Sequence, residues 1–201
     1  MIVVGLTGGI ASGKSFIVKY LKKLKIPTHD SDITINSFYK KPNKIFLELL
    51  RKEGFGQAIK KNKIDKKMIR NEIFINKHRR KKLEKYLHQE VRKKRKEFIK
   101  KHKITKKHKI IFLDIPLLFE NNLQAECDYV CSTIAPIKTR EKRALQRTGM
   151  NVSTFRLIVK NQVKDKIRRA KSNFIINTAA SEINTYIQID NMLYNILKKN
   201  K

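Results

Sequence analysis

Short apolar runs alternate with longer amphipathic stretches along this chain. Residues 2–7, 110–113, 129–134 and 174–176 are apolar over most of their length, and residues 26–29 allow one more brief strand. Runs of this length without polar alternation are typical of strands buried on both faces of a parallel sheet. Because helical patterns separate these runs, we predict an α/β fold of three layers, in which helices cover both faces of a five-stranded parallel sheet.

The amphipathic stretches carry apolar residues at intervals of three and four, which is the period of a helix with one buried face. We predict a helix over residues 14–23, a basic helical stretch over 138–171 and a closing helix at the carboxyl-terminal end. The predicted buried stripe of the first helix consists of Ile17, Tyr20, Leu21 and Leu24. The predicted stripe of the closing helix consists of Ile183, Tyr186, Ile187, Leu193, Tyr194 and Leu197.

Residues 35–109 differ from the rest in charge and in pattern. They contain 28 Lys and Arg against 7 Asp and Glu, and the apolar positions within them keep a helical spacing. We therefore predict a helical insertion over residues 35–104 with its own small core, between the two halves of a main domain at 1–34 and 105–201. The stripe that predicts this second core consists of Leu83, Tyr86, Leu87, Val91 and Phe98.

The composition narrows the class of protein. No run approaches the ~18 apolar residues of a membrane span, and the first residues already read as a strand, so we expect a cytoplasmic protein without a membrane partner. Cys127 and Cys131 are spaced four apart without further metal ligands nearby, and we expect reduced, inert thiols. A monomer or a weak homo-oligomer is expected.

The net charge of +31 favours attraction to polyanions. A bias of composition explains much of it equally well, because Lys, Ile and Asn are abundant together, Trp is absent, and the basic residues are interspersed through amphipathic segments. We therefore expect no obligatory nucleic-acid partner.

Residues 8–15 read Gly-Gly-Ile-Ala-Ser-Gly-Lys-Ser and match the pattern G-x-x-x-x-G-K-[ST] in full. Gly8 and Gly13 permit positive φ angles, so that successive main-chain N–H groups can point inward and bind an anion. The helix that begins near Lys14 adds the positive end of its dipole. Lys14 supplies a mobile charge for the β- and γ-phosphates, and the Ser15 hydroxyl is placed to coordinate Mg²⁺.

A second pattern, Asn62-Lys63-Ile64-Asp65, matches the guanine-reading N-K-x-D of GTPases. We interpret it as coincidence, because a polar, Lys-rich stretch precedes it where a strand is required, and no D-x-x-G follows the loop. ATP is therefore the predicted donor, with Mg²⁺ as its metal. The predicted ATP-binding residues of the loop are Gly8, Gly9, Ile10, Ala11, Ser12, Gly13, Lys14, Ser15 and Phe16.

Two aspartates follow predicted strands, at the edge where α/β sheets place ligands. Asp32 would accept or orient the proton of an acceptor hydroxyl, although an Asp before an apolar helix is also a common N-cap. Asp114 would hold Mg²⁺ directly or through water, with a purely structural role as the alternative. Leu117 and Leu118 would form an apolar wall against the acceptor, or lie in the core.

Arg140, Arg143 and Arg147 recur at i, i+3 and i+7, which would place them on one face of a helix. Arginines on one face suit a short lid over residues 138–170 that closes on transferring phosphates. The alternative is one more basic surface in a basic protein.

The stretch from Gly5 to Ser15 closely resembles the opening of dephospho-coenzyme A kinases. The resemblance continues in order through nearly the whole chain: in Asp30-Ser31-Asp32, in residues 69–74, in Leu87-His88, in the segment DIPLLFE from Asp114 to Glu120, and in Arg143, Arg147, Gln162 and residues 175–177. Phe16 and Gln89 depart from the pattern of the family, which usually has a small hydroxyl residue and a proline there.

The resemblance implies transfer of the γ-phosphoryl group of ATP to the ribose 3′-hydroxyl of dephospho-coenzyme A, the last step of coenzyme A synthesis. It strengthens Arg143 and Arg147 as phosphate ligands and adds Asn177 to the ATP-binding residues. Lys14, Asp32 and Arg143 are then the predicted catalytic residues. The predicted acceptor-binding residues are Asp32, His88, Arg92, Leu117 and Leu118.

Two rival functions remain open from the sequence. The nearest is another kinase of the same fold that acts on a nucleotide or nucleoside, which shares the loop but not DIPLLFE. The other is a basic NTPase that binds RNA or DNA, which would interleave exposed aromatic residues with basic ones. A nucleotide-gated switch is disfavoured by the missing GTPase motifs.

Overall fold

The computed structural model describes residues 1–61, 63–69 and 77–200. The chain divides into two compact units, one formed by Met1–His29 with Ile99–Lys201 and the other by Asp30–Phe98. These divisions fall a few residues before each of the boundaries expected at 35 and 104. The second division lies inside a single continuous helix, so no change in the hydrophobic pattern of the sequence marks it.

The first unit is built on a five-stranded sheet of order β2-β5-β1-β6-β7. β1 runs parallel to both β5 and β6, with Leu6 opposite Asp114 and Gly8 opposite Thr133. The carboxyl ends of these three strands therefore meet at one edge, and the predicted parallel sheet of an α/β fold is confirmed. The strands are β1 (Ile2–Gly8), β2 (Thr28–Asp30), β5 (Ile110–Asp114), β6 (Tyr129–Ile134) and β7 (Phe174–Asn177).

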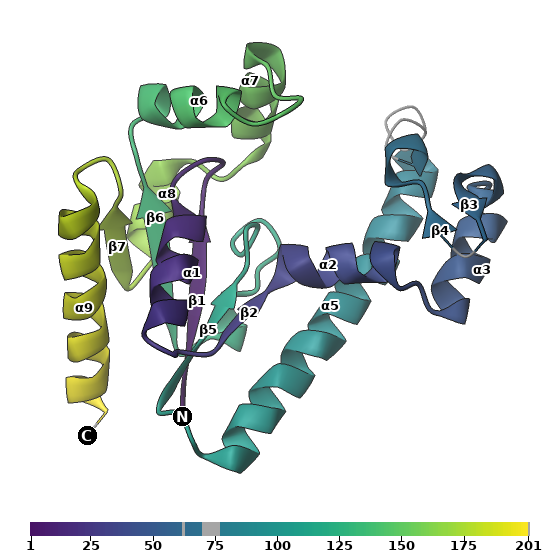
Figure 1. Cartoon of the computed structure of the whole chain (residues 1–201). Coiled ribbons are helices and arrows are strands. Elements are labelled where there is room, and N and C mark those ends of the chain that lie inside the picture. Colours follow the sequence, from purple (N-terminus) through teal and green to yellow (C-terminus); the bar gives the residue numbers. More distant parts are fainter. Residues whose placement is uncertain (62, 70–76, 201) are drawn as a thin grey trace. The chain divides into compact units, whose positions relative to one another are not determined.

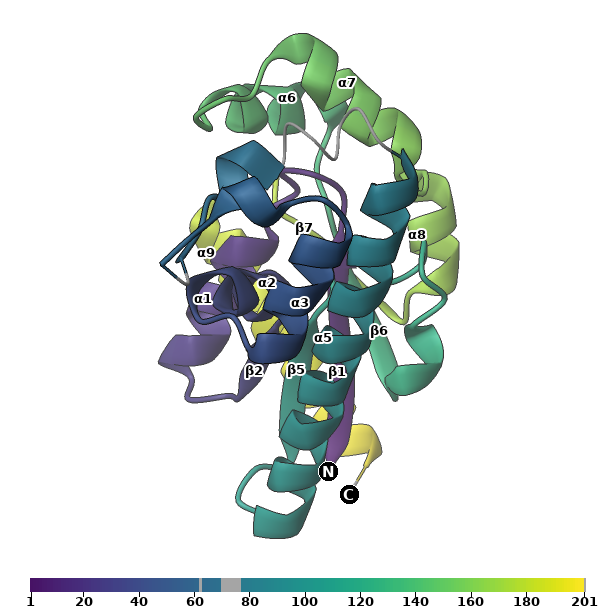
Figure 2. The ribbon, with the colours of Figure 1, turned by 90° about the vertical axis from the view of Figure 1, so that its right-hand side faces the viewer.

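Helices flank this sheet on both faces. α1 (Lys14–Lys23) and α9 (Glu182–Lys199) share one apolar core with the sheet, in which Leu6, Phe112 and Ile189 are completely buried (Figure 1). α8 (Asp165–Lys171) packs against β6 on the opposite face, where the hydroxyls of Ser132 and Ser172 lie 2.7 Å apart. α6 (Ile137–Leu145) and α7 (Val152–Asn161) lie beyond the carboxyl ends of β1 and β6 (Figure 2).

The closing helix contains all six residues of its predicted stripe, but that stripe is only partly correct as a buried face, since Leu193 is buried and three others are not. Ile183, Ile187 and Tyr194 are exposed, at 70%, 53% and 63%. The side chains that α9 buries against the sheet are Thr185, Ile189, Met192, Leu193 and Ile196. Apolar residues occur all around this helix, so their spacing did not identify the buried side. On α1, Ile17 and Leu21 are buried as predicted, whereas Leu24 is exposed.

The second unit is a small helical domain with a two-stranded hairpin. Its elements are α2 (Ser31–Lys40), α3 (Lys44–Lys52), the 3-10 turn η1 (Gly56–Ala58), β3 (Ile59–Lys60), β4 (Lys63–Ile64) and most of α5 (Lys77–Thr105). Phe46, Phe55 and Leu83 are at most 2% exposed at its centre, and Leu87 joins the same cluster. The prediction of a second apolar core from the α5 stripe is confirmed for Leu83 and Leu87.

The structure also explains the N-K-x-D match. Lys63 and Ile64 form β4, antiparallel to β3, and the Asp65 carboxylate accepts hydrogen bonds from the amides of Lys67 and Met68. Asp65 thus caps a helical turn. Asn62 and residues 70–74 of the resemblance lie outside the described residues.

The two cysteines are free thiols, and Cys131 is completely buried in β6. Burial raises the pKa of the Cys131 thiol to about 12, so the reactive thiolate is suppressed at neutral pH. Among the described helices, none has both the length and the apolar character needed to cross a bilayer.

Candidate active site

The phosphate loop joins β1 to α1 at the carboxyl edge of the sheet. Gly13, the N-cap of α1, has φ 94°, in the left-handed region that favours glycine. A Cβ built on Gly13 would lie 2.8 Å from the side chain of Thr178. Within the loop, the amide of Ser12 donates to the carbonyl of Gly9 at 3.1 Å. Both backbone angle and available space therefore require glycine at position 13.

We expect Gly13→Ala to weaken ATP binding at least tenfold and to lower the free energy of unfolding by roughly 1–3 kcal/mol, because a left-handed alanine is strained and meets Thr178. Isothermal titration with ATP and thermal unfolding would measure the two effects. Gly56→Ala is the matched control, since a Cβ there meets nothing within 4 Å. Equal ATP affinity in the two variants would contradict this role of the loop.

Lys14 and Asp114 meet at the head of the loop. Lys14 Nζ lies 3.4 Å from Asp114 Oδ1, and the two side chains are only 15% and 9% exposed. Asp114 ends β5, the strand beside β1, so the sheet order brings together two residues 100 positions apart. A partly buried pair is less screened by water than a surface pair. The ammonium is therefore held where the phosphates of a nucleotide in the loop would need it.

The residues predicted to hold Mg²⁺ fit that ion. Mg²⁺ prefers oxygen ligands and usually keeps several waters, binding through one or two protein groups plus the phosphates of its substrate. Asp114 offers a carboxylate at the end of β5, and Ser15 offers an exposed hydroxyl in the first turn of α1. Among the described residues no cluster of three or more His, Cys, Asp or Glu could hold a metal. The available donors thus suit a metal that is shared with phosphate.

Arg143 is connected to the loop through Thr178. Its guanidinium donates to the Oγ1 and the main-chain carbonyl of Thr178 at 3.0 and 2.7 Å. The Thr178 hydroxyl in turn donates to the carbonyl of Ser12 at 2.8 Å. The Ser12 hydroxyl lies 2.5 Å from that of Thr133 in β6. Arg143 is thus held beside the loop, as its predicted contact with phosphate requires.

Thr133 and Thr178 were missed from the sequence. Their positions in the sequence could have identified them. Each lies at or just beyond the carboxyl end of an apolar strand, which is the edge of a parallel sheet where ligands bind. Their small hydroxyls fit between the loop and the strand ends, and both of these side chains are at most 5% exposed.

The prediction that three arginines share one helix face is wrong. α6 ends at Leu145, and Arg147 lies in the following turn, exposed to solvent, where its amide donates to the carbonyl of Ala144. The turn is completed by Gly149 at φ 77°, which a helix cannot accommodate. Arg140 is on α6 but only 4% exposed, and its Nε donates to the carbonyl of Ile10.

Phe16 and Asn177 lie near the loop with contacts of their own. The Phe16 ring stacks on Tyr186 of α9, with centroids 5.1 Å apart. The Asn177 side chain accepts a hydrogen bond from the amide of Ala179, and Gln188 binds both main-chain groups of Asn177. Asn177 therefore shapes the turn that leads to Thr178.

The predicted acceptor residues are divided between the units. Leu118 is completely buried and faces Gly5 in the core, which removes it from the acceptor wall, whereas Leu117 is 40% exposed. His88 and Arg92 are exposed on α5, four residues apart and so on one side of that helix.

Asp32 lies in the first turn of α2, two residues beyond the end of β2. The side chain that caps α2 belongs to Asp30, which accepts from the amide of Ile33 at 2.8 Å. The N-cap alternative for Asp32 is therefore excluded, and its exposed carboxylate is not committed to that bond.

A parallel sheet of this order, with a phosphate loop after its first strand and Lys14 beside the aspartate of a neighbouring strand, places the protein in the class of phosphate-loop, nucleotide-binding folds. Its fold resembles shikimate kinase from Bacteroides thetaiotaomicron, with a TM-score of 0.52 and 13% identity over 98% of both chains. Dephospho-CoA kinase from Campylobacter jejuni is more similar, with a TM-score of 0.73 and 24% identity over 99% of this chain and 98% of that one.

The family model for dephospho-CoA kinase matches residues 2–183. The dephospho-CoA kinase of Bartonella quintana is 32% identical over 198 residues, which cover 98% of this chain and all of that relative. That of Rhizobium meliloti is 31% identical over 181 residues, 90% and 91% of the two chains. The chain belongs to the dephospho-CoA kinase family, and it is a nucleotide-binding phosphotransferase.

Proposed function

We propose that this chain transfers the γ-phosphoryl group of ATP to the ribose 3′-hydroxyl of dephospho-coenzyme A, giving coenzyme A and ADP in the last step of coenzyme A synthesis. The observation that carries the proposal is the pairing of Lys14 with Asp114 at the head of the loop, in a chain that matches its family over residues 2–183. Membership of the family supports dephospho-coenzyme A as the acceptor, and the phosphate loop supports ATP as the donor.

Each group at the loop has a separate task in this reaction. The main-chain amides and the dipole of α1 bind the triphosphate, and Lys14 binds the oxygens on which negative charge collects during transfer. Arg143 adds a forked cation beside the loop. Ser15 and Asp114 would hold Mg²⁺, which neutralises charge on the β- and γ-phosphates when bound.

Asp32 would orient the 3′-hydroxyl and take its proton. Transfer of phosphoryl groups runs through a loose transition state, so aligning the attacking oxygen matters as much as the basicity of the carboxylate. The position of Asp32 just after β2, together with capping of α2 by Asp30, supports this role. His88 and Arg92 are proposed contacts of the acceptor from α5.

The experiment that tests the function measures ADP release from Mg-ATP with a panel of acceptors. We expect turnover with dephospho-coenzyme A to exceed that with AMP, CMP or shikimate by at least a hundredfold, and short RNA to leave the rate unchanged. Mass spectrometry should find one added phosphate on the 3′-oxygen. Preference for another acceptor, or stimulation by RNA, would replace the proposal with one of its rivals.

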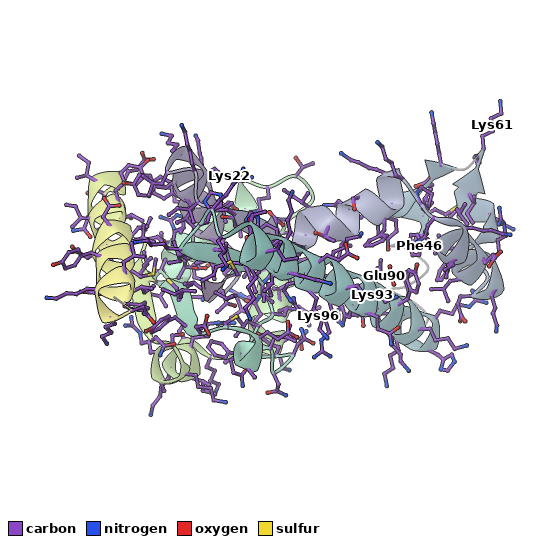
Figure 3. The ribbon with its side chains drawn as sticks, turned by 90° about the horizontal axis from the view of Figure 1, so that it is seen from below. Lys22, Phe46, Lys61, Glu90, Lys93 and Lys96 are labelled. Carbon is purple, nitrogen blue, oxygen red and sulfur yellow. The ribbon has the colours of Figure 1, made fainter. Side chains whose placement is uncertain are left out.

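Positive charge on α5 predicts salt dependence. This helix contains 14 Lys and Arg against three Glu, and ion pairs within the helix include Arg80–Glu84 and Lys93–Glu90 (Figure 3). Both substrates are polyanions, so the remaining charge should speed their encounter. We expect KM for both substrates to rise severalfold between about 0.1 and 1 M salt, over which the Debye length shortens from about 10 to 3 Å.

Steady-state kinetics in KCl, with sucrose as an uncharged control, would measure this dependence. A constant KM across the series would assign the charge to amino-acid composition alone.

A further inference from the structure

The main-chain amide and carbonyl of Ile10, in the middle of the phosphate loop, are both bound by side chains from the lid region. The amide donates to Gln162 Oε1 at 2.8 Å, and the carbonyl accepts from Arg140 Nε at 2.9 Å. Gln162 follows α7 directly and Arg140 belongs to α6. Both polar groups of this one residue are therefore oriented by chain more than 120 residues away in sequence.

Apolar contacts support the same arrangement. Ala11 of the loop packs in one cluster with Ala144 of α6 and Phe155 of α7, and Phe155 is only 2% exposed. The cluster joins the loop to the helices that hold Arg140 and Gln162. The position of the loop is thus tied to the position of α6 and α7.

Behind Arg140 lies a row of alternating charges. Arg140 Nη1 is 3.2 Å from Asp165 Oδ2, and the other oxygen of Asp165 is 3.1 Å from Arg168 Nη1. Arg168 Nη2 lies 3.0 Å from Glu120 Oε1, which also accepts from the amide of Val163 at 2.8 Å. The two arginines are 4% and 2% exposed in their side chains.

These four side chains carry two positive and two negative charges, so the row is neutral. Burial lowers the pKa of Arg140, and the nearby Asp165 carboxylate opposes that change. A buried guanidinium needs such partners, and removing one leaves the other charge uncompensated. The orientation of Arg140, and hence of the Ile10 carbonyl, should therefore depend on residues that are remote from the nucleotide.

We propose that Glu120, Asp165 and Arg168 are positioning residues for phosphoryl transfer, which act by holding Arg140 against the carbonyl of Ile10 and so set the geometry of the phosphate loop. The inference rests on the proposed function for its turnover readout, but binding of ATP tests it independently of the acceptor. None of the three residues needs to touch either substrate.

The test compares Asp165→Asn, Arg140→Lys and the double variant. Asp165→Asn keeps the shape and removes the charge, and Arg140→Lys keeps the charge but removes the fork that serves Ile10 and Asp165 together. We expect each single variant to weaken ATP binding by about tenfold and to lower kcat by a similar factor, with KM for the acceptor unchanged within about twofold. The double variant should be no worse than Arg140→Lys alone.

Glu182→Gln, an equal loss of charge at an exposed position of α9, is the control and should bind ATP like the wild type. Asp165→Glu should restore part of the lost affinity. Additive effects in the double variant, or unchanged ATP affinity in folded Asp165→Asn, would overturn the proposal and leave the row a purely structural element.

If Asp165→Asn does not fold, Glu120→Gln at the far end of the row carries the same expectation of about a tenfold loss of ATP affinity. Thermal unfolding of each variant identifies the folded ones. A wild type that binds ATP but does not phosphorylate dephospho-coenzyme A would refute the proposed acceptor, while ATP affinities would still decide the role of the row.

Discussion

Lys14→Ala should reduce turnover to below about one-hundredth of the wild-type rate. Lys14 Nζ is the mobile cation at the head of the phosphate loop and is only partly exposed beside Asp114. Its charge interacts most strongly with phosphate oxygens as they gain negative charge in the transition state, and losses of about 10²- to 10³-fold are typical when one such group is removed. Removing the ammonium also leaves the Asp114 carboxylate without this ion pair. The negative charge of that carboxylate would then repel the triphosphate.

Coupled measurement of ADP release at saturating substrate would determine kcat for this variant, and circular dichroism would verify the fold. Lys22→Ala is the matched control, because Lys22 lies on the same helix with its side chain exposed to solvent (Figure 3). The control should retain wild-type turnover. More than about a tenth of the wild-type rate in Lys14→Ala would refute the assignment of the loop.

Asp32→Asn should lower kcat by roughly 10²- to 10⁴-fold, the usual contribution of a positioned general base, while the KM for ATP changes by less than about threefold. The amide cannot accept the proton of the acceptor hydroxyl, yet it preserves the size of the side chain. The helix itself should be unaffected, since Asp30 makes the capping bond of α2. Initial rates over a matrix of both substrate concentrations would separate the two constants.

Asp65→Asn provides the control for this charge change within the same unit, because asparagine can still accept the bonds that Asp65 receives from Lys67 and Met68. Its rate should match the wild type. An Asp32→Asn enzyme with normal turnover would reduce Asp32 to a surface residue of the first turn of α2.

Local features of the sequence determined the parts of the site that depend on neighbouring residues. The phosphate loop is eight contiguous residues long, and Gly13 was chosen as a residue that permits a positive φ, which it adopts at 94°. β6 was predicted residue for residue, because a short run that is mostly apolar and lies between polar segments is typical of a buried strand. The presence of an α/β fold and of a nucleotide site therefore followed from short-range patterns.

Periodicity failed where more than one answer satisfied it. On α9, Ile183, Ile187 and Leu193 were all predicted to be buried, but of these three only Leu193 is. The fully buried Ile189 was not part of the predicted stripe. On α6, the spacing of Arg140 and Arg147 suggested one helix that continues through both, whereas α6 ends at Leu145 and Arg147 lies in the turn that follows. A helical spacing of apolar residues predicts that one face of a helix will be buried, but the element that packs against the helix decides which face it is.

By itself, then, the sequence determined the class of fold, the phosphate loop and the strands that end at it, because backbone angles and apolar runs act between residues close along the chain. Only the tertiary structure decided that Arg140 is buried against Ile10, that Thr178 connects Arg143 to Ser12, and that Asp114 meets Lys14. These contacts join residues about 35 to 166 positions apart. The order of strands in the sheet brings them together, and no local propensity encodes that order.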